Sequence, residues 1–387
     1  MRTTSAPAVT ATVLDVHRIV ADGYHNAFCS LVRWRDDYYL AFRQAQTHNP
    51  VFPGTIQIWR CPCKPLHANG RGVIYDWKPC AILATGGDDR DPKLVPMDDG
   101  LAVIFGTYYP RWPWAHFARQ TIPNAIYDLI SHSSVSRDGS TWSTSQQIYR
   151  PNYWIWSVVV TKPDDYQAMA YHSGEAHDGG SLTRLSSAGF SHLWYTQEFL
   201  TFSGTEAPAE PALASDDDTK EYVCCVRNGD WGDARWGQRR RDSNSGLLAT
   251  RWAWIWTSLA EPVHAPALLQ YGPGWLVAGR MLRDTVLARP RLSMQKALPP
   301  QAREAKRKAS ERWVTGLGLK TAEGFQRLAV LPSWGDNSYP GMVWEDPETV
   351  LLAYYSQHMR QDEAKDPYYP TPADIFIARI RLEQSDA

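Results

Sequence analysis

The sequence predicts an all-β fold, a six-bladed β-propeller, because one two-strand unit recurs six times along the chain. Each copy is a short apolar run, a polar turn and a second apolar run that ends on a polar side chain, as in residues 210–215 and 221–228. The equivalent register positions are Cys29, Pro92, Ser157, Pro211, Pro266 and Pro340. They are 63, 65, 54, 55 and 74 residues apart, which fits one four-stranded blade per repeat.

The repeat also predicts a single domain over residues 1–387. Its blades start near Phe28, Asp91, Trp156, Glu210, Ala265 and Tyr339. Insertions are expected at about 109–130 and 284–320. The aromatic part of the first, residues 109–117, is a candidate lid over the channel mouth, and the charged part of the second, residues 299–312, is a candidate surface helix. Residues 11–20 and 373–383 alternate like strands, so we expect the two ends to pair in the last blade and close the ring.

Composition narrows the class of partner. With 40 basic and 41 acidic residues, the chain lacks the positive charge of a protein that binds nucleic acid by neutralising phosphates. No apolar run is long enough to span a membrane, and residues 1–13 lack the pattern of a signal peptide. We therefore expect a soluble protein without nucleic-acid or membrane partners, cytoplasmic if the N-terminus is complete.

No metal or cofactor is expected from the sequence. The six cysteines include a C-x-C and an adjacent pair, and neither has the spacing of a zinc site. Free buried thiols are the simpler interpretation.

Candidate site residues follow from the propeller geometry, because equivalent positions on the inner strands converge at the central axis. The positions just before the register marks are Phe28, Asp91, Trp156, Glu210, Ala265 and Tyr339. The ends of the second strands add Arg43, His172, Arg227 and Arg280. Many of these side chains are polar where apolar residues would have served packing, which indicates a binding or catalytic site.

A turn at residues 136–142, Ser-Arg-Asp-Gly-Ser-Thr-Trp, has the composition of a hairpin staple. Asp138 can accept backbone N–H groups, and Gly139 can supply a positive φ. The segment resembles the Asp box of the sialidase (bacterial neuraminidase repeat) superfamily, one residue shorter than the full pattern. Residues 187–194 resemble a decayed copy, with Ala188 at the position of the aspartate. Such boxes indicate a fold and not a reaction.

The resemblance to sialidases covers nearly the whole chain and implies roles for four residues. It implies that Tyr339 of the sixth blade is a nucleophile, that Glu210 of the fourth blade removes its proton, and that Arg227 and Arg280 bind a substrate carboxylate. A neutral phenol can attack an anionic sugar without charge repulsion, and guanidinium groups hold a carboxylate by paired hydrogen bonds.

The sequence departs from the family pattern on the first blade. The arginine expected near Ala27 is absent, so Arg43 is a candidate to complete the set. The expected acid/base aspartate is also absent, and His25, His48 or Asp91 could serve instead. Trp156 and His172 are further candidates for contact with the sugar.

Three functions remain open. The first is an exo-acting, sialidase-like glycoside hydrolase that removes a terminal sugar, expected to be acidic. The second is a sugar lyase that acts on a uronic acid with a histidine acid/base. The third is a carbohydrate-binding propeller without catalysis. Each candidate residue also has a structural alternative: Tyr339 could be a packed aromatic, and the arginines could pair with neighbouring carboxylates.

Overall fold

The structure is a computed structural model, and it describes most of the chain. The described residues are 9–50, 52–67, 73–110, 127–172, 181–190, 193–202, 206–216, 221–229, 232–241, 252–283, 312–363 and 372–384. The candidate lid beyond Pro110 and residues 299–311 of the candidate helix lie outside them. β10 begins at Tyr127 and β22 at Trp313, inside the ranges expected to be insertions.

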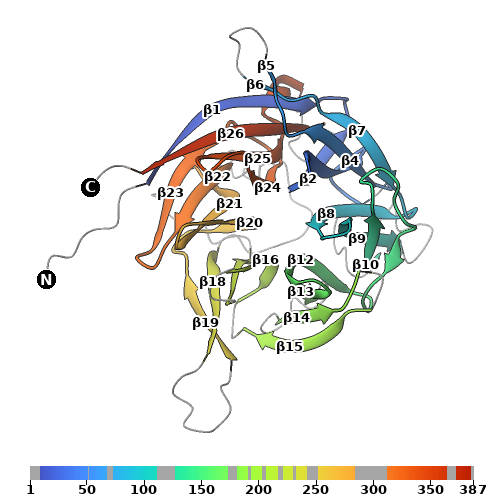
Figure 1. Ribbon diagram of the computed structural model, residues 1–387, viewed down its shortest axis with the longest axis vertical. Helices are drawn as coiled ribbons and strands as arrows, with labels where there is room; N and C mark the ends of the chain where they lie inside the picture. Colours follow the sequence, from blue (N-terminus) through green and yellow to red (C-terminus); the bar gives the residue numbers. More distant parts are fainter. Residues whose placement is uncertain are drawn as a thin grey trace, which may run out of the picture.

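Six four-stranded antiparallel sheets stand around a central axis as the blades of a propeller (Figure 1). Blade one is β2 (His25–Trp34), β3 (Asp37–Ala45), β4 (Thr55–Pro62) and β7 (Lys78–Leu83). Blade two is β8 (Asp88–Pro96), β9 (Leu101–Pro110), β10 (Tyr127–Ser136) and β11 (Gln146–Gln147). Blade three is β12 (Tyr153–Lys162), β13 (Asp165–His172), β14 (Ser181–Ser187) and β15 (Tyr195–Thr201). The predicted fold class is confirmed.

The second half of the ring repeats the pattern. Blade four is β16 (Pro208–Ser215), β17 (Tyr222–Asn228), β18 (Gly232–Arg241) and β19 (Trp252–Ser258). Blade five is β20 (Val263–Tyr271), β21 (Gly274–Leu282), β22 (Trp313–Lys320) and β23 (Phe325–Val330). Blade six is β24 (Asn337–Trp344), β25 (Thr349–Ser356), β26 (Asp374–Gln384) and β1 (Val9–Val20). A short pair, β5 (Leu66–His67) and β6 (Val73–Ile74), and the 3₁₀ helix η2 (His358–Glu363) lie between blade strands.

The two ends of the chain close the ring in blade six. β1 pairs antiparallel with β26 from Val9 opposite Gln384 to Val20 opposite Ile375, and the two strands run side by side in Figure 1. The predicted pairing of the terminal strands is therefore confirmed. Because β1 comes from the beginning of the chain and the other three strands of this blade from its end, the pairing ties the first and last segments together.

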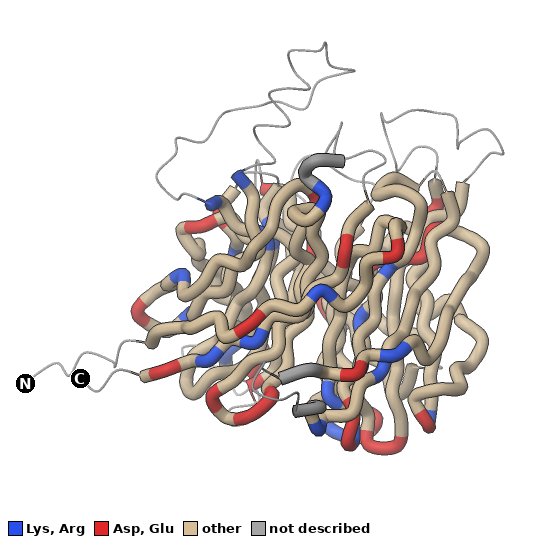
Figure 2. The backbone as a smooth tube through the Cα atoms, turned by 90° about the horizontal axis from the view of Figure 1, so that it is seen from above, with Lys and Arg blue, Asp and Glu red and all other residues tan. Residues whose placement is uncertain are grey.

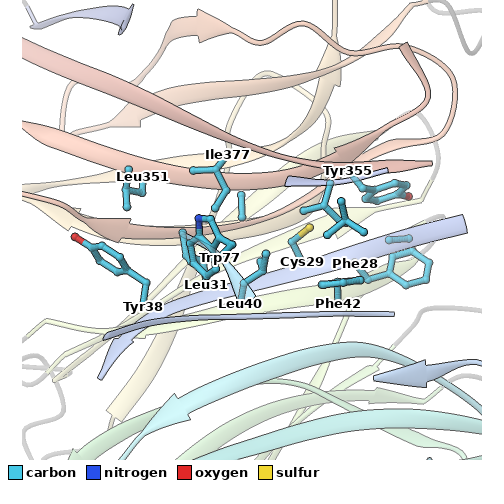
Figure 3. Packing of buried hydrophobic residues seen from close by; sticks show 14 of the residues in the cluster. Phe28, Cys29, Leu31, Tyr38, Leu40, Phe42, Trp77, Leu351, Tyr355 and Ile377 are labelled. Carbon is cyan, nitrogen blue, oxygen red and sulfur yellow. The ribbon is translucent and has the colours of Figure 1, made fainter. Parts of the chain in front are cut away.

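Packing between blades explains why the strands are apolar on both faces. Separate clusters of buried side chains fill the six interfaces between neighbouring blades. Between blades six and one, Leu351 and Ile377 meet Leu31 and Leu40 (Figure 3). A seventh cluster, which includes Trp156, lies toward the axis. Each blade thus completes its core only against its two neighbours.

The hairpin at residues 136–142 is held as its sequence predicts. Asp138 Oδ1 accepts the backbone N–H groups of Ser140 at 2.8 Å and Thr141 at 2.6 Å, and these bonds lower the pKa of Asp138. Gly139 has a φ of +75° and donates its N–H to Ser136 Oγ at 2.8 Å. Trp142 packs against the core between blades one and two.

Charged residues are distributed over the whole ring. Figure 2 shows basic and acidic positions interspersed along the backbone, as the near-zero net charge suggests. Among the described residues, no helix has the length and apolar character needed to cross a membrane.

Candidate active site

All six inner strands carry a β-bulge at the same register position. In blade one, the pairing of β2 with β3 shifts register between Ala27 and Ser30. An equivalent register shift occurs in the inner strand of each other blade. The bulged residues are Phe28, Asp91, Trp156, Glu210, Ala265 and Tyr339, the positions identified from the repeat. They lie two or three residues inside the inner strands and not at their first residues. A bulge re-aims a side chain, and here it happens six times around one axis.

Five of these residues have a left-handed backbone although none is glycine. Their φ values are 63° for Phe28, 52° for Asp91, 53° for Glu210, 44° for Ala265 and 45° for Tyr339. Such a conformation costs on the order of 1 kcal/mol or more per residue and persists where the surrounding structure imposes it. Its repetition here therefore marks the axial end of the inner strands as a functional candidate.

Tyr339 occupies the centre of this group. Its ring packs edge-on against Phe28, with ring centres 4.9 Å apart, and against Trp156 at 6.1 Å. The Tyr339 hydroxyl donates a hydrogen bond to Glu210 Oε1 at 2.7 Å. The structure thus joins blade six to blade four through the two residues that the family resemblance singled out.

Glu210 is held by three donors. Arg227 Nη1 donates to the same Oε1 at 2.7 Å, and the backbone N–H of Ala265 donates to Oε2 at 2.7 Å. The Glu210 side chain is only 7% exposed. A carboxylate fixed in this way presents one oxygen to Tyr339 without needing to reorganise.

The Tyr339 phenol is protonated at ordinary pH. Burial and the negative charge of Glu210 raise its pKa well above 10, although Arg227 and Arg280 act in the opposite direction. The phenol therefore needs a base at the moment of attack, and Glu210 is in hydrogen-bonding contact with it.

The two arginines flank Tyr339 and reach the surface. The Arg227 side chain is 20% exposed and that of Arg280 is 14% exposed. Arg280 lies over the Tyr339 ring, 5.4 Å from its centre, and donates to the carbonyl of Asn337 at 2.9 Å. Two partly exposed positive charges therefore lie close to the phenol.

Asp91 lies beside the same group. It is 4% exposed, and no hydrogen bond is found for its Oδ1 among the described residues. Burial, opposed by the cations Lys93 and Arg90 and reinforced by Glu210, raises the pKa of Asp91 to about 7. Burial also lowers the pKa of Lys93, whose Nζ lies over the Trp156 ring at 4.9 Å. A carboxyl group with this pKa can donate and accept protons near neutral pH.

Sequence reasoning missed Asp336, the residue that organises the other side of the site. Asp336 Oδ2 lies 3.0 Å from His25 Nε2 and 2.5 Å from His48 Nδ1. Its Oδ1 accepts from Tyr355 Oη at 2.8 Å and from Arg280 Nη2 at 2.8 Å. The two histidines and Arg280, all predicted candidates, are thus brought together by a residue that was not predicted.

A register signal for Asp336 was present in the sequence. Asp336 stands three residues before the bulge residue Tyr339, as His25 stands before Phe28 and as Asp88 stands before Asp91. His25, Asp88 and Asp336 are each no more than 2% exposed. In blades one, two and six, this position three residues before the bulge therefore carries a second set of buried polar side chains.

His25 and His48 differ in their exposure to solvent. His25 is buried, and the loss of solvation lowers its pKa to about 4 against the opposing effect of Asp336. The His48 side chain is 28% exposed. Burial would raise the pKa of Asp336, but His48, His25 and Arg280 outweigh it and hold that pKa well below the ordinary value.

Arg43 and His172 both lie at the ends of second strands, as the repeat predicts, but their surroundings differ. Arg43 is 0% exposed, and its Nε donates to Asp88 Oδ1 at 2.8 Å while its Nη1 donates to the carbonyl of Thr47. In this structure Arg43 joins blades one and two through a buried carboxylate and, among the described residues, makes no hydrogen bond to Tyr339 or Glu210. His172 ends β13, and its ring packs on Tyr153 at 4.9 Å.

The fold is shared with solved structures. A protein of unknown function from Dyadobacter fermentans is 14% identical, with a TM-score of 0.67 over 97% of this chain and 100% of that one. The Trypanosoma rangeli sialidase in complex with the inhibitor DANA is 8% identical, with a TM-score of 0.56 over 97% of this chain. This chain spans 60% of the length of that sialidase.

These comparisons define the class by fold. The chain is an all-β, six-bladed propeller of the kind found in sialidases, and identities this low establish only the fold. No protein-family model matches the sequence, and no curated protein matches it either.

Proposed function

We propose that the protein is an exo-acting glycoside hydrolase that removes a terminal acidic sugar through a tyrosine nucleophile. The observation that carries the proposal is the 2.7 Å hydrogen bond from Tyr339 Oη to Glu210 Oε1 among inward-aimed bulge residues. A phenol in contact with a fixed carboxylate is the arrangement that nucleophilic catalysis requires. Arg227 and Arg280 suit the recognition of an anionic sugar.

The first step forms a glycosyl-tyrosine. Glu210 takes the proton of Tyr339 as Oη attacks the anomeric carbon, and the glycosidic C–O bond breaks. Asp91, with its pKa raised to about 7, gives its proton to the departing oxygen. We assign this role to Asp91 because it is electrostatically coupled to both Tyr339 and Glu210, whereas His25 and His48 contact Asp336.

The second step restores the enzyme. The Asp91 carboxylate takes a proton from water, whose oxygen attacks the anomeric carbon. The bond to Tyr339 breaks, and Glu210 returns the proton to the phenolate oxygen. The net reaction adds one water across the glycosidic bond, with two displacements at the same carbon and retention of configuration.

A lyase is the second candidate, and the contact between His48 and Asp336 favours it. A carboxylate that holds one nitrogen of a partly exposed imidazole orients the ring as a base. Such a base could remove the proton next to the carboxylate of a uronic acid and expel the neighbouring glycosidic oxygen. That product would carry a new double bond, and no water would be consumed.

One experiment distinguishes a hydrolase from a lyase and from a non-catalytic propeller. The protein is incubated, in heavy-oxygen water, with glycans that end in sialic, other ulosonic or uronic acids and with glycans in which a uronic acid carries a further sugar on C4, and the products are analysed by mass spectrometry. A free sugar with one heavy oxygen is the result expected for the hydrolase. An unsaturated sugar would instead identify the lyase. Binding without any product across the panel would contradict both and favour a non-catalytic propeller.

A further inference from the structure

We infer that His25, His48 and Asp336 form a binding site for one divalent transition-metal ion, with zinc as the best-matched ion. The ligand atoms offered by these three side chains all lie within 4.8 Å of one another. Among the described residues, these three form a group of side chains whose ligand atoms are close enough together to hold a metal ion. Two imidazoles and one carboxylate are a donor set that zinc and ferrous iron use in proteins.

Both imidazoles approach the same atom. His25 Nε2 lies 3.0 Å and His48 Nδ1 lies 2.5 Å from Asp336 Oδ2. In a tetrahedral zinc site with bonds of about 2.0–2.1 Å, ligand atoms stand about 3.3 Å apart. The donors therefore need to move by only about 1.5 Å or less to surround an ion. His48, the most exposed of the three, gives solvent access to the site.

The carboxylate is fixed from behind, as metal-binding carboxylates commonly are. Tyr355 Oη and Arg280 Nη2 each donate to Oδ1 at 2.8 Å, so Oδ2 is the oxygen left to face the histidines. The backbone N–H of Asp336 donates to Gln357 Oε1 at 2.9 Å, and this bond holds the turn itself. Outer contacts of this kind orient the ligand toward the ion.

The fold explains why the proposed metal site cannot be recognised from the spacing of its three ligands along the sequence. His25 begins β2, His48 follows β3, and Asp336 immediately precedes β24. The first two belong to blade one and the third leads into blade six, the blade that closes the ring. Three protein ligands leave at least one position for water or an oxygen ligand.

The test measures metal directly and needs no substrate. The full chain is stripped with a chelator, and Zn²⁺ is titrated by calorimetry at neutral pH. We expect one ion per chain for the wild type and at least a 100-fold weaker affinity for His48→Ala. The matched control is His17→Ala, because His17 also faces a single carboxylate, that of Asp15 at 3.3 Å, but lies in an outer strand away from the cluster. It should bind like the wild type.

Co²⁺ serves as a second probe, because the six cysteines could bind metal on their own. Occupation of the proposed site gives visible ligand-field bands without the near-ultraviolet thiolate band, and His48→Ala removes those bands. Asp336→Asn, if it folds, should lose them as well. A wild type that binds neither ion, equal binding by His48→Ala and His17→Ala, or a thiolate spectrum would each overturn the inference. Failure of the hydrolase proposal would leave these readouts unchanged.

Discussion

Tyr339 and Glu210 lie 129 positions apart in the chain, yet the phenol of one donates to the carboxylate of the other at 2.7 Å. The ring of blades brings the two strands to one axis, and a bulge in each strand aims the side chains at one another. The contact is therefore a product of the fold as a whole. It is also the part of the site on which the proposed chemistry depends.

Removal of the Tyr339 hydroxyl should abolish turnover and leave binding. Tyr339→Phe keeps the ring contacts with Phe28 and Trp156 but loses the nucleophilic oxygen. We expect kcat on the glycan identified by the panel to fall by about 10³-fold or more, with Kd within a few-fold. Steady-state kinetics and calorimetry measure the two quantities. Tyr171→Phe, which changes a partly buried phenol beside Trp156, is the control that should stay active.

Neutralising the base should impair the same step. Glu210→Gln keeps the shape of the side chain but cannot take the proton of Tyr339. We expect a loss of about 10²–10⁴-fold in kcat, the usual range for general base catalysis. A wild-type rate in this variant would show that the hydrogen bond serves only the fold. Circular dichroism and a melting curve verify that the variant is folded.

Asp91 should set the alkaline limb of the pH–rate profile. Because its pKa is raised to about 7, the acid is protonated below that pH and loses its proton above it. We expect kcat/KM to fall as pH rises through about 7, and Asp91→Asn to lower the rate and remove this limb. Leaving groups that need no proton should rescue the variant. An unchanged limb in Asp91→Asn would assign the proton donor to another group, and His48→Ala would be tested next.

The fold and part of the candidate site could be predicted from the sequence for one physical reason, which is repetition. Glu210 and Tyr339 could be found because each occupies the same register position in its blade, and that position proved to be the bulge. Asp336 lies three residues earlier, where no apolar run marks the register. Its partners His25 and His48 come from another blade, so only the closed ring shows that they meet.

The same reasoning explains why the surroundings of Arg43 differ from those of Arg227 and Arg280. The side chain at the end of a second strand was expected to lie beside the candidate site, as Arg227 and Arg280 do. Arg43 instead turns toward blade two, because Asp88 there offers a buried carboxylate 2.8 Å away. Which partner a long side chain chooses depends on contacts between blades, and a single repeat does not contain that information.

Buried His132 should make the protein less stable in mild acid. Burial lowers its pKa to about 4 from an ordinary 6.5, so between these values the unfolded chain binds a proton that the folded chain does not. Stability is then complete above pH 6.5 and is lost as the pH falls toward 4, by at most about 3 kcal/mol for this group. Denaturant unfolding across this range measures it. His132→Asn should flatten the slope relative to the wild type, and His17→Asn should not.

The most direct test of the central claim is to trap the bond to Tyr339. An acidic sugar with fluorine at the anomeric carbon and at its neighbour should react with the nucleophile and hydrolyse slowly, so that the intermediate accumulates. Intact-mass spectrometry followed by peptide mapping should find one sugar per chain, on Tyr339, and none in Tyr339→Phe. Hydrolysis of the parent glycan with no adduct, or with the adduct on another residue, would contradict the account.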